Sequence, residues 1–277
     1  MNGSREINPR SRIFYATIMK TKHPLLAALS ALLFALPLIA ADPPAAPAAA
    51  PAPAAPYLDP DATRLLQAAS AQLTAAKAFS FKAEIWEDAV VLGHKVTTTR
   101  TVETKLRRPD RLQIEVHSPK RSRGFWYDGK SLTLLSRPEN LYGTVAVPDT
   151  IDKVIDAAND QFGLNLPLED LLVSDPYASA MERVKGSVYF GKVTILGTPC
   201  QHLAVSSDVV DWQLWIEDGA KPLIKKLVIT YKQEATAPQF TAIFSEWKLS
   251  GELADQTFAF TPPKDAAKIE VLPAADE

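Results

Sequence analysis

The chain of 277 residues carries 30 lysines and arginines against 32 aspartates and glutamates, and it contains a single cysteine, Cys200. This slightly acidic balance argues against nucleic acid as a general partner, and a lone thiol cannot form an internal disulfide. The folded part must therefore be stabilised by its core alone.

Residues 19–41 have the pattern of a secretory signal peptide. Lys20 and Lys22 precede an apolar run from Leu25 to Leu36, which Pro37 and small residues follow. We expect export and cleavage near Ala41. An uncleaved membrane anchor is the alternative, although the run is shorter than the roughly 20 residues that a spanning helix needs. Residues 1–18 are either an extended basic leader or a sign that translation starts at Met19.

Residues 42–56 are almost entirely proline and alanine, which predicts an extended linker because the segment has nothing to bury. The linker either holds the folded part away from the N-terminus or is a tail without a role. Residues 57–277 are expected to form a single domain, since no second linker divides them. Once residues 1–41 are removed, 25 basic and 31 acidic side chains remain.

The domain is predicted to open with a helix from Asp59-Pro60 to Ala78. The period then changes to two, because Phe79, Phe81, Ala83 and Ile85 alternate with polar residues, as in a half-buried strand. Asp128-Gly129 is a strong hairpin signal. Further alternation predicts strands at 95–107, 111–117, 125–127, 132–134 and 141–147.

Residues 149–181 interrupt the strands with a helical pattern, beginning with a helix that Asp149 is expected to cap. Strands are then expected at 188–196, 200–206, 213–217, 225–231, 240–249 and 257–260. Short turns between sequential strands favour antiparallel pairing. We therefore predict a mainly β (α+β) fold: a curved, half-open antiparallel sheet or barrel with an N-terminal helix and an inserted helical lid.

Four runs resemble a predicted periplasmic family, domain of unknown function 2092: WYDGKSL at 126–132, PDTID at 148–152, DWQLWIEDG at 211–219 and KLVITYK at 226–232. The resemblance covers about residues 60–270. That family is thought to resemble the periplasmic lipoprotein carriers and their outer-membrane acceptors (LolA/LolB-like), which have a half-barrel sheet and a helical lid over an apolar cavity. The resemblance implies this fold, a periplasmic location and binding of acyl chains or lipoproteins.

The residues that share the apolar face of the predicted strands are either the wall of a ligand cavity or a closed core. The cavity candidates are Phe79, Phe81, Ile114, Phe125, Tyr127, Leu132, Leu134, Trp212, Leu214, Ile216, Phe240 and Phe244. Burying ten methylenes is worth about 8 kcal/mol, so a bare apolar cavity can hold a lipid chain. The lid candidates, on the apolar stripe of the inserted segment, are Ile151, Val154, Ile155, Phe162 and Leu166.

A basic run offers Arg107, Arg108, Arg121 and Arg123 as candidates for docking an anionic partner or membrane headgroups. The alternative is an ordinary solvated sheet face. No histidine cluster at metal-ligand spacing, nucleophile elbow or glycine-rich phosphate loop is present, so we expect no enzyme, metal or cofactor.

We therefore expect a monomeric periplasmic carrier-like protein for an acylated lipid or lipoprotein. An envelope sensor or protein-interaction module without lipid transport is the alternative, and a hydrolase comes last.

Overall fold

The computed structural model of this chain describes residues 57–249 and 251–274. The predicted leader and linker lie outside the described residues. Five helical elements are described: α1 (Pro60–Ala75), α2 (Ile151–Phe162), the 3-10 helix η1 (Glu169–Leu171), α3 (Pro176–Met181) and the 3-10 helix η2 (Asp255–Thr257).

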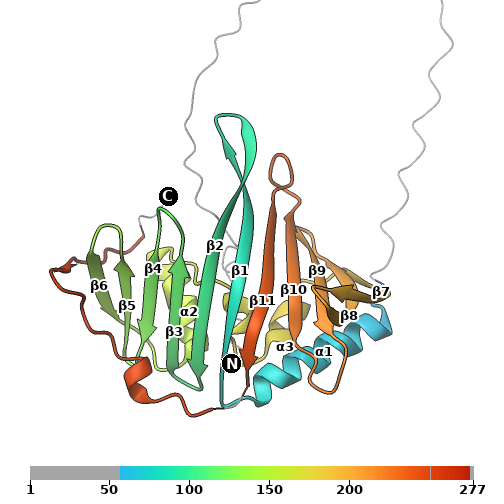
Figure 1. Ribbon diagram of the computed structural model, residues 1–277, viewed down its shortest axis with the longest axis horizontal. Coiled ribbons are helices and arrows are strands. Elements are labelled where there is room, and N and C mark those ends of the chain that lie inside the picture. Colours follow the sequence, from blue (N-terminus) through green and yellow to red (C-terminus); the bar gives the residue numbers. More distant parts are fainter. Residues whose placement is uncertain (1–56, 250, 275–277) are drawn as a thin grey trace, which may run out of the picture. The chain divides into compact units, whose positions relative to one another are not determined.

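All described strands join one 12-stranded sheet in the order β12-β6-β5-β4-β3-β2-β1-β11-β10-β9-β8-β7 (Figure 1). The strands are β1 (Ala78–Val91), β2 (His94–Arg107), β3 (Arg111–His117), β4 (Arg123–Tyr127), β5 (Ser131–Ser136), β6 (Leu141–Ala146), β7 (Gly186–Ile195), β8 (Thr198–Ser206), β9 (Val210–Glu217), β10 (Ile224–Tyr231), β11 (Gln239–Lys248) and β12 (Ala267–Lys268).

The sheet is curved and does not close into a barrel, because β12 and β7 remain at opposite edges (Figure 1). Neighbouring strands run antiparallel apart from β12, which pairs in parallel with β6. The predicted fold class is confirmed: an open, mainly antiparallel sheet with an N-terminal helix and a helical segment inserted between two groups of strands.

Helices α1, α2 and α3 form a layer on one face of the sheet. In Figure 1, α2 and α3 lie behind the strands. Helix α1 packs beside α3, where the Ser70 hydroxyl accepts from the Tyr177 N–H at 2.9 Å and the Thr74 hydroxyl donates to the Ser174 carbonyl at 3.1 Å. The apolar residues of α1 are buried in this layer, namely Ala62, Leu65, Ala69 and Leu73.

Local sequence explains most of these elements. Asp59 caps α1, since its side chain accepts from the Asp61 and Ala62 N–H groups and proline follows at the first helical position. Helix α2 ends at Gly163, whose φ of 59° is the left-handed conformation that glycine adopts without strain at a helix C-terminus. The β4–β5 hairpin turns at the predicted Asp128-Gly129, where Asp128 accepts from the N–H groups of Lys130 and Ser131.

Three details differ from the predictions. The first helix ends at Ala75, because Ala78 already pairs with Arg107 in the sheet. Strand β1 continues to Val91, beyond the predicted alternation. Thr150 caps α2 in place of Asp149, whose carboxylate instead pairs with Lys153 at 2.9 Å.

The expected strand at 257–260 is wrong. Its start belongs to η2, and Phe258 turns into the core, where it is 1% exposed. The Arg107 guanidinium lies 5.4 Å from the centre of the Phe258 ring. Apolar character in this segment therefore reflects docking of one aromatic side chain, which a strand-like pattern cannot distinguish from pairing.

Candidate functional site

The strand register places all twelve cavity candidates on the sheet face that carries the helices. Directly paired residues of neighbouring strands share a face. One row runs from Phe79 through Leu106 and Leu112 to Tyr127 and Leu132. The next row runs from Phe81 through Thr104 and Ile114 to Phe125 and Leu134. In the other half of the sheet the same face holds Trp212, Leu214, Ile216, Phe240 and Phe244.

Two contacts identify this face as the one the helical layer covers. The Tyr127 hydroxyl donates to the carbonyl of Pro148, just before α2, at 2.8 Å. The guanidinium of Arg108, which binds the inserted segment, lies 5.8 Å from the centre of the Phe79 ring. Burial raises the pKa of Tyr127 to about 12, so this phenol remains a hydrogen-bond donor at neutral pH.

Ten of the twelve candidates are buried, and Leu134 and Trp212 are half-exposed. The packing at the centre is aromatic. The Phe81 ring lies 5.5 Å from Phe244 in an edge-on arrangement and 6.4 Å from Phe79. Each buried aromatic side chain contributes about 1.5–3 kcal/mol of transfer free energy. In this structure the face is packed against its cover.

Trp247 belongs to the same cluster and was missed at the level of sequence. Its ring lies 4.6 Å from Phe81 and 5.5 Å from Phe244, and its indole N–H donates to the Ile224 carbonyl at 3.0 Å. Strict alternation from Phe244 would place Trp247 on the opposite face. The register shifts near Ser80, and Glu246 has a φ of 53°, so a bulge turns Trp247 inward.

The inserted segment, residues 147–185, contains the lid candidates. Ile151, Val154, Ile155 and Leu166 are each at most 1% exposed, whereas Phe162 is half-buried. Helix α2 thus directs one apolar stripe inward, as its periodicity predicts. Whether these residues move as a lid remains a prediction.

Hydrogen bonds hold the insert at its margins. The Ile151 N–H donates to the Pro109 carbonyl at 2.9 Å, and Arg108 donates to the carbonyls of Leu172 and Val173 at 3.2 and 2.8 Å. Within the insert, Asp152 accepts from the Ser174 N–H at 2.9 Å. The attachments to the sheet therefore come from the β2–β3 turn and lie beside the apolar contact surface of the insert.

Two buried polar side chains, Glu169 in the insert and Thr104 in the sheet, differ in their hydrogen-bond partners. Glu169 is 7% exposed, and its carboxylate accepts from the Leu166 N–H at 2.9 Å and the Asn159 amide at 3.0 Å. Thr104 is fully buried in the apolar face between Phe81 and Ile114, and its hydroxyl has no hydrogen-bond partner among the described residues. An unpaired hydroxyl is unfavourable in an apolar core.

The four docking candidates separate into two pairs. Arg107 donates to the Leu253 carbonyl at 2.7 Å and pairs with Asp255, and Arg108 binds the insert. Burial lowers the pKa of Arg108. Arg121 and Arg123, at the β3–β4 turn, are exposed. Only the second pair remains available to an external anion.

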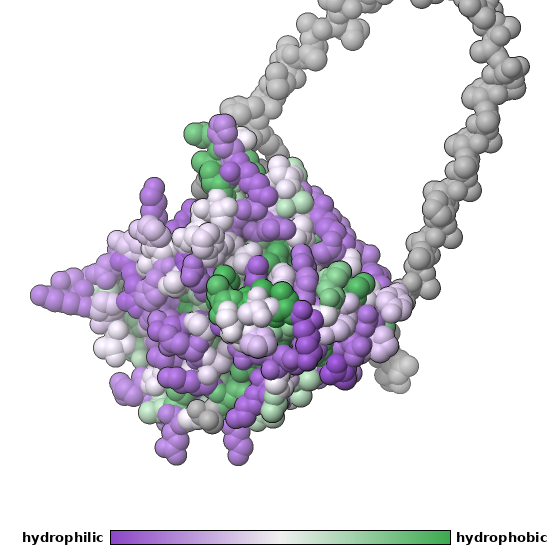
Figure 2. Space-filling model, turned by 45° about the vertical axis from the view of Figure 1, so that its right-hand side comes forward, coloured by the Kyte–Doolittle hydropathy of each residue, from purple (hydrophilic) through white to green (hydrophobic). Residues whose placement is uncertain are grey.

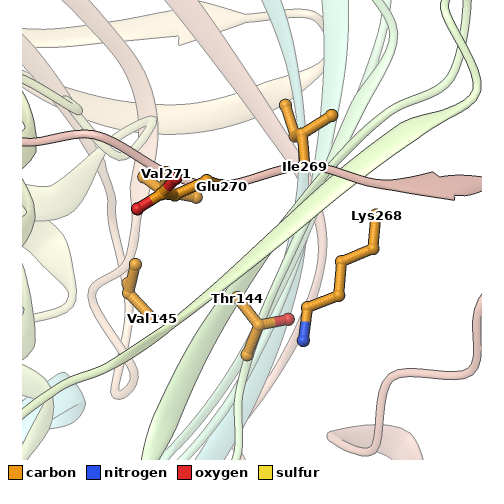
Figure 3. A pocket seen from close by; sticks show the side chains of 6 residues that line it. All are labelled: Thr144, Val145, Lys268, Ile269, Glu270 and Val271. Carbon is orange, nitrogen blue, oxygen red and sulfur yellow. The ribbon is translucent and has the colours of Figure 1, made fainter.

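A shallow pocket of about 420 Å³ lies at the β6 and β12 edge of the sheet (Figure 3). Its lining comes from Thr144 and Val145 on one side and from residues 268–271 on the other. None of the cavity candidates lines it. Among residues 57–249 and 251–274, no group of three or more histidine, cysteine or carboxylate side chains is placed to hold a metal ion.

A family model described as a predicted periplasmic protein (DUF2092) matches residues 62–272, which covers most of the chain. The chain belongs to this family. A search of curated protein sequences found no match. Within the described part of the chain, no helix is long and apolar enough to cross a bilayer.

The fold of this chain was also compared with solved structures. Lipoprotein LppX from Mycobacterium tuberculosis is 8% identical, with a TM-score of 0.46, and the match covers 71% of this chain and 100% of LppX. LprF from Mycobacterium bovis is 13% identical, with a TM-score of 0.42, over 77% of this chain and 100% of LprF. A LolA superfamily protein from Nitrosomonas europaea is 9% identical, with a TM-score of 0.37, over 72% and 97% of the two chains. These likenesses concern the fold alone.

Proposed function

We propose that this protein is an exported periplasmic carrier that binds the acyl chains of a lipid or lipoprotein on the helix-side face of its sheet. The leader would be removed near Ala41, and the protein would act as a monomer without enzymatic chemistry. One observation carries the proposal. An inserted segment covers a continuous apolar face that has aromatic residues at its centre. Hydrogen bonds at the margin of the segment attach it to the sheet.

Binding requires the insert to exchange its contacts with the sheet for contacts with a ligand. Separating Ile151, Val154 and Ile155 from the sheet would cost several kcal/mol, at about 1.5–3 kcal/mol for each fully buried side chain. An acyl chain returns about 0.8 kcal/mol for each methylene that it buries. A chain of ten or more methylenes is therefore long enough to offset the opening of α2.

The test is uptake of a fluorescent fatty-acyl probe by delipidated protein. Val154 is fully buried, so Val154→Asp places an unpaired carboxylate on the contact surface of α2. We expect probe affinity to change by tenfold or more, while circular dichroism shows that the sheet remains folded. Gln161→Asp is the matched control, because it introduces the same charge at an exposed position of the same helix.

A permanent core would give a different result. Val154→Asp would then unfold the whole domain, and the delipidated wild type would take up no acyl probe. Either the absence of wild-type uptake or an equal effect of Gln161→Asp would reject the carrier function and favour the protein-interaction module.

A further inference from the structure

The tip of the β1–β2 hairpin is an exposed apolar surface that the proposed carrier function does not use. Leu92 at its apex is 94% exposed, and Val91, Val90 and Val96 are 51%, 40% and 39% exposed. Figure 2 shows hydrophobic residues gathered at the top of the molecule, where this hairpin projects. Large apolar side chains in such a position are costly in water and mark a contact surface.

The tip projects because strands β1 and β2 extend beyond the ends of the neighbouring strands (Figure 1). Strand β11 pairs with β1 only as far as Glu87, opposite Phe240, and β3 pairs with β2 only as far as Thr101, opposite His117. Beyond these points residues 89–96 pair with each other across the hairpin. The ribbon pairs its inward backbone groups by itself, but its outward groups have no strand beside them, so it can enter only the outer, hydrated part of a bilayer.

Apolar side chains lie on both faces of the ribbon. Ala89 pairs with Val96, so Val91 and Val96 share one face, while Val90, opposite Lys95, lies on the other. A single protein surface would cover one of these faces and leave the other in water. A fluid apolar medium covers both faces and the apex at once.

Leu92 is also poorly suited to its backbone. Leu92 and Gly93 have φ values of 52° and 79° and connect the paired residues Val91 and His94, which describes a two-residue turn of the type that prefers Asn-Gly. Leucine is strained at positive φ, whereas asparagine tolerates it. Local folding therefore does not account for leucine at this position.

We propose that the tip of the β1–β2 hairpin inserts into the outer part of a lipid bilayer. A group of polar contacts around Asp88 limits the depth to which the tip can insert. Asp88 pairs with Lys95 at 2.7 Å and accepts from the Thr97 hydroxyl at 2.9 Å and the Gln239 N–H at 3.1 Å. Val91, the last paired residue before the apex, lies three residues beyond Asp88, or about 10 Å along the strand, which is comparable to the depth of about 5–10 Å reached by interfacial segments.

The membrane contact is mainly apolar, since Lys95 is already paired with Asp88. Vesicles of neutral phosphatidylcholine are therefore sufficient for binding, and salt has little effect on it. This behaviour separates insertion of the tip from electrostatic docking by arginines. The proposal also goes beyond the carrier function. It concerns a different surface, and this surface contacts an intact bilayer instead of a single acyl chain.

The experiment measures flotation of the protein, as recovered from the cell envelope, with phosphatidylcholine vesicles. Leu92→Asn removes the apolar apex and relieves the backbone strain, so we expect about tenfold weaker binding together with a thermal midpoint equal to or above that of the wild type. Leu92→Trp should show fluorescence that lipids brominated in their acyl chains quench.

Leu196 provides a matched control. It is 74% exposed with a φ of 49°, and it precedes Gly197 in the β7–β8 turn, which the antiparallel pairing places at the strand ends opposite to the β1–β2 tip. Leu196→Asn should also relieve strain but leave vesicle binding unchanged, and Leu196→Trp should not be quenched. Wild-type protein that fails to float, or equal binding by the Leu92→Asn and wild-type proteins, would overturn the proposal. Uptake of a soluble acyl probe is measured separately, so the two proposals fail independently.

Discussion

Arg107 and Arg108 are neighbours in the sequence, but their side chains fasten two different segments to the sheet. Arg107 binds residues 253 and 255 of the C-terminal segment, and Arg108 binds the carbonyls of Leu172 and Val173 in the insert. The Arg108 side chain also covers the Phe79 ring, while its Nε is buried without a partner among the described residues. A charged donor with two carbonyl acceptors thus stabilises the packing of the insert on the sheet, at the cost of partial desolvation.

Arg108→Met should loosen the insert. The methionine keeps an apolar stem over Phe79 but removes both hydrogen bonds, which together are worth about 2 kcal/mol after the relief of desolvation is allowed for. We expect faster amide hydrogen exchange at residues 164–175, measured by mass spectrometry, and faster uptake of the acyl probe. Arg107→Met is the control and should accelerate exchange at residues 253–258 instead. Equal exchange profiles for the two variants would contradict the separate roles.

The β3–β4 turn, residues 118–122, and the first residue of β4 present the two exposed docking candidates, Arg121 and Arg123. The Ser122 hydroxyl donates to the Ser118 carbonyl at 2.9 Å, and the Ser118 hydroxyl accepts from the Arg121 N–H at 3.0 Å. These bonds fix the backbone of the turn while the side chains of Arg121 and Arg123 extend into solvent. The turn is therefore an element at which an anionic partner of the protein could dock without displacing an internal contact.

Reversing the charge of this turn tests that role. Arg121→Glu combined with Arg123→Glu should weaken binding to vesicles containing anionic lipid by about 1 kcal/mol or more for each residue, and added salt should produce a similar loss in the wild type. Lys221→Glu with Lys225→Glu is the control, because these lysines lie in or after the β9–β10 turn at the other end of the sheet. If binding in low salt is unchanged, the arginines are an ordinary solvated surface.

At the scale of the whole molecule, Asp59 connects the N-terminal helix to the edge of the sheet. One carboxylate oxygen caps α1, and the other accepts from the Tyr189 N–H of β7 at 3.1 Å. Tyr57 and Leu58 pair with β7 next to this point, where the Ser187 N–H donates to the Tyr57 carbonyl at 2.8 Å. The hydrogen bond from Tyr189, followed by those from Ala62 and Asp61, holds the pKa of Asp59 below its ordinary value of 3.8.

This lowered pKa makes the attachment sensitive to acid. Because the folded state favours the carboxylate, the stabilisation is fully present above the ordinary pKa of 3.8 and is lost as pH falls through the lowered pKa of the folded state. Asp59→Asn should lower stability at neutral pH, since an amide cannot accept from both sides, and should flatten the acid limb of denaturation midpoints measured by fluorescence. Asp61→Asn, in the same turn, should retain the wild-type acid limb. An unchanged limb in Asp59→Asn would show that the attachment contributes no linkage.

Much of the fold could be predicted because its signals are local. Alternation of period two assigns Phe79, Ile114, Leu214 and Phe244 to one face, and all twelve cavity candidates share that face in the structure. The stripe of α2 and the turn at Asp128-Gly129 follow from helical spacing and turn chemistry. These features depend on residues that are close in the chain, so they can be predicted without a tertiary structure.

The sequence by itself determined the open β-rich class, the position of the helical insert and the sidedness of the strands. Only the tertiary structure decided which arginines are occupied, how Trp247 joins Phe81, and that Phe258 packs beneath Arg107. The partners of Arg107 and Arg108 lie 146 and 64 residues away, and the inward turn of Trp247 depends on a bulge. Contacts between residues so far apart in the chain depend on how whole elements pack together, and local periodicity cannot predict that packing.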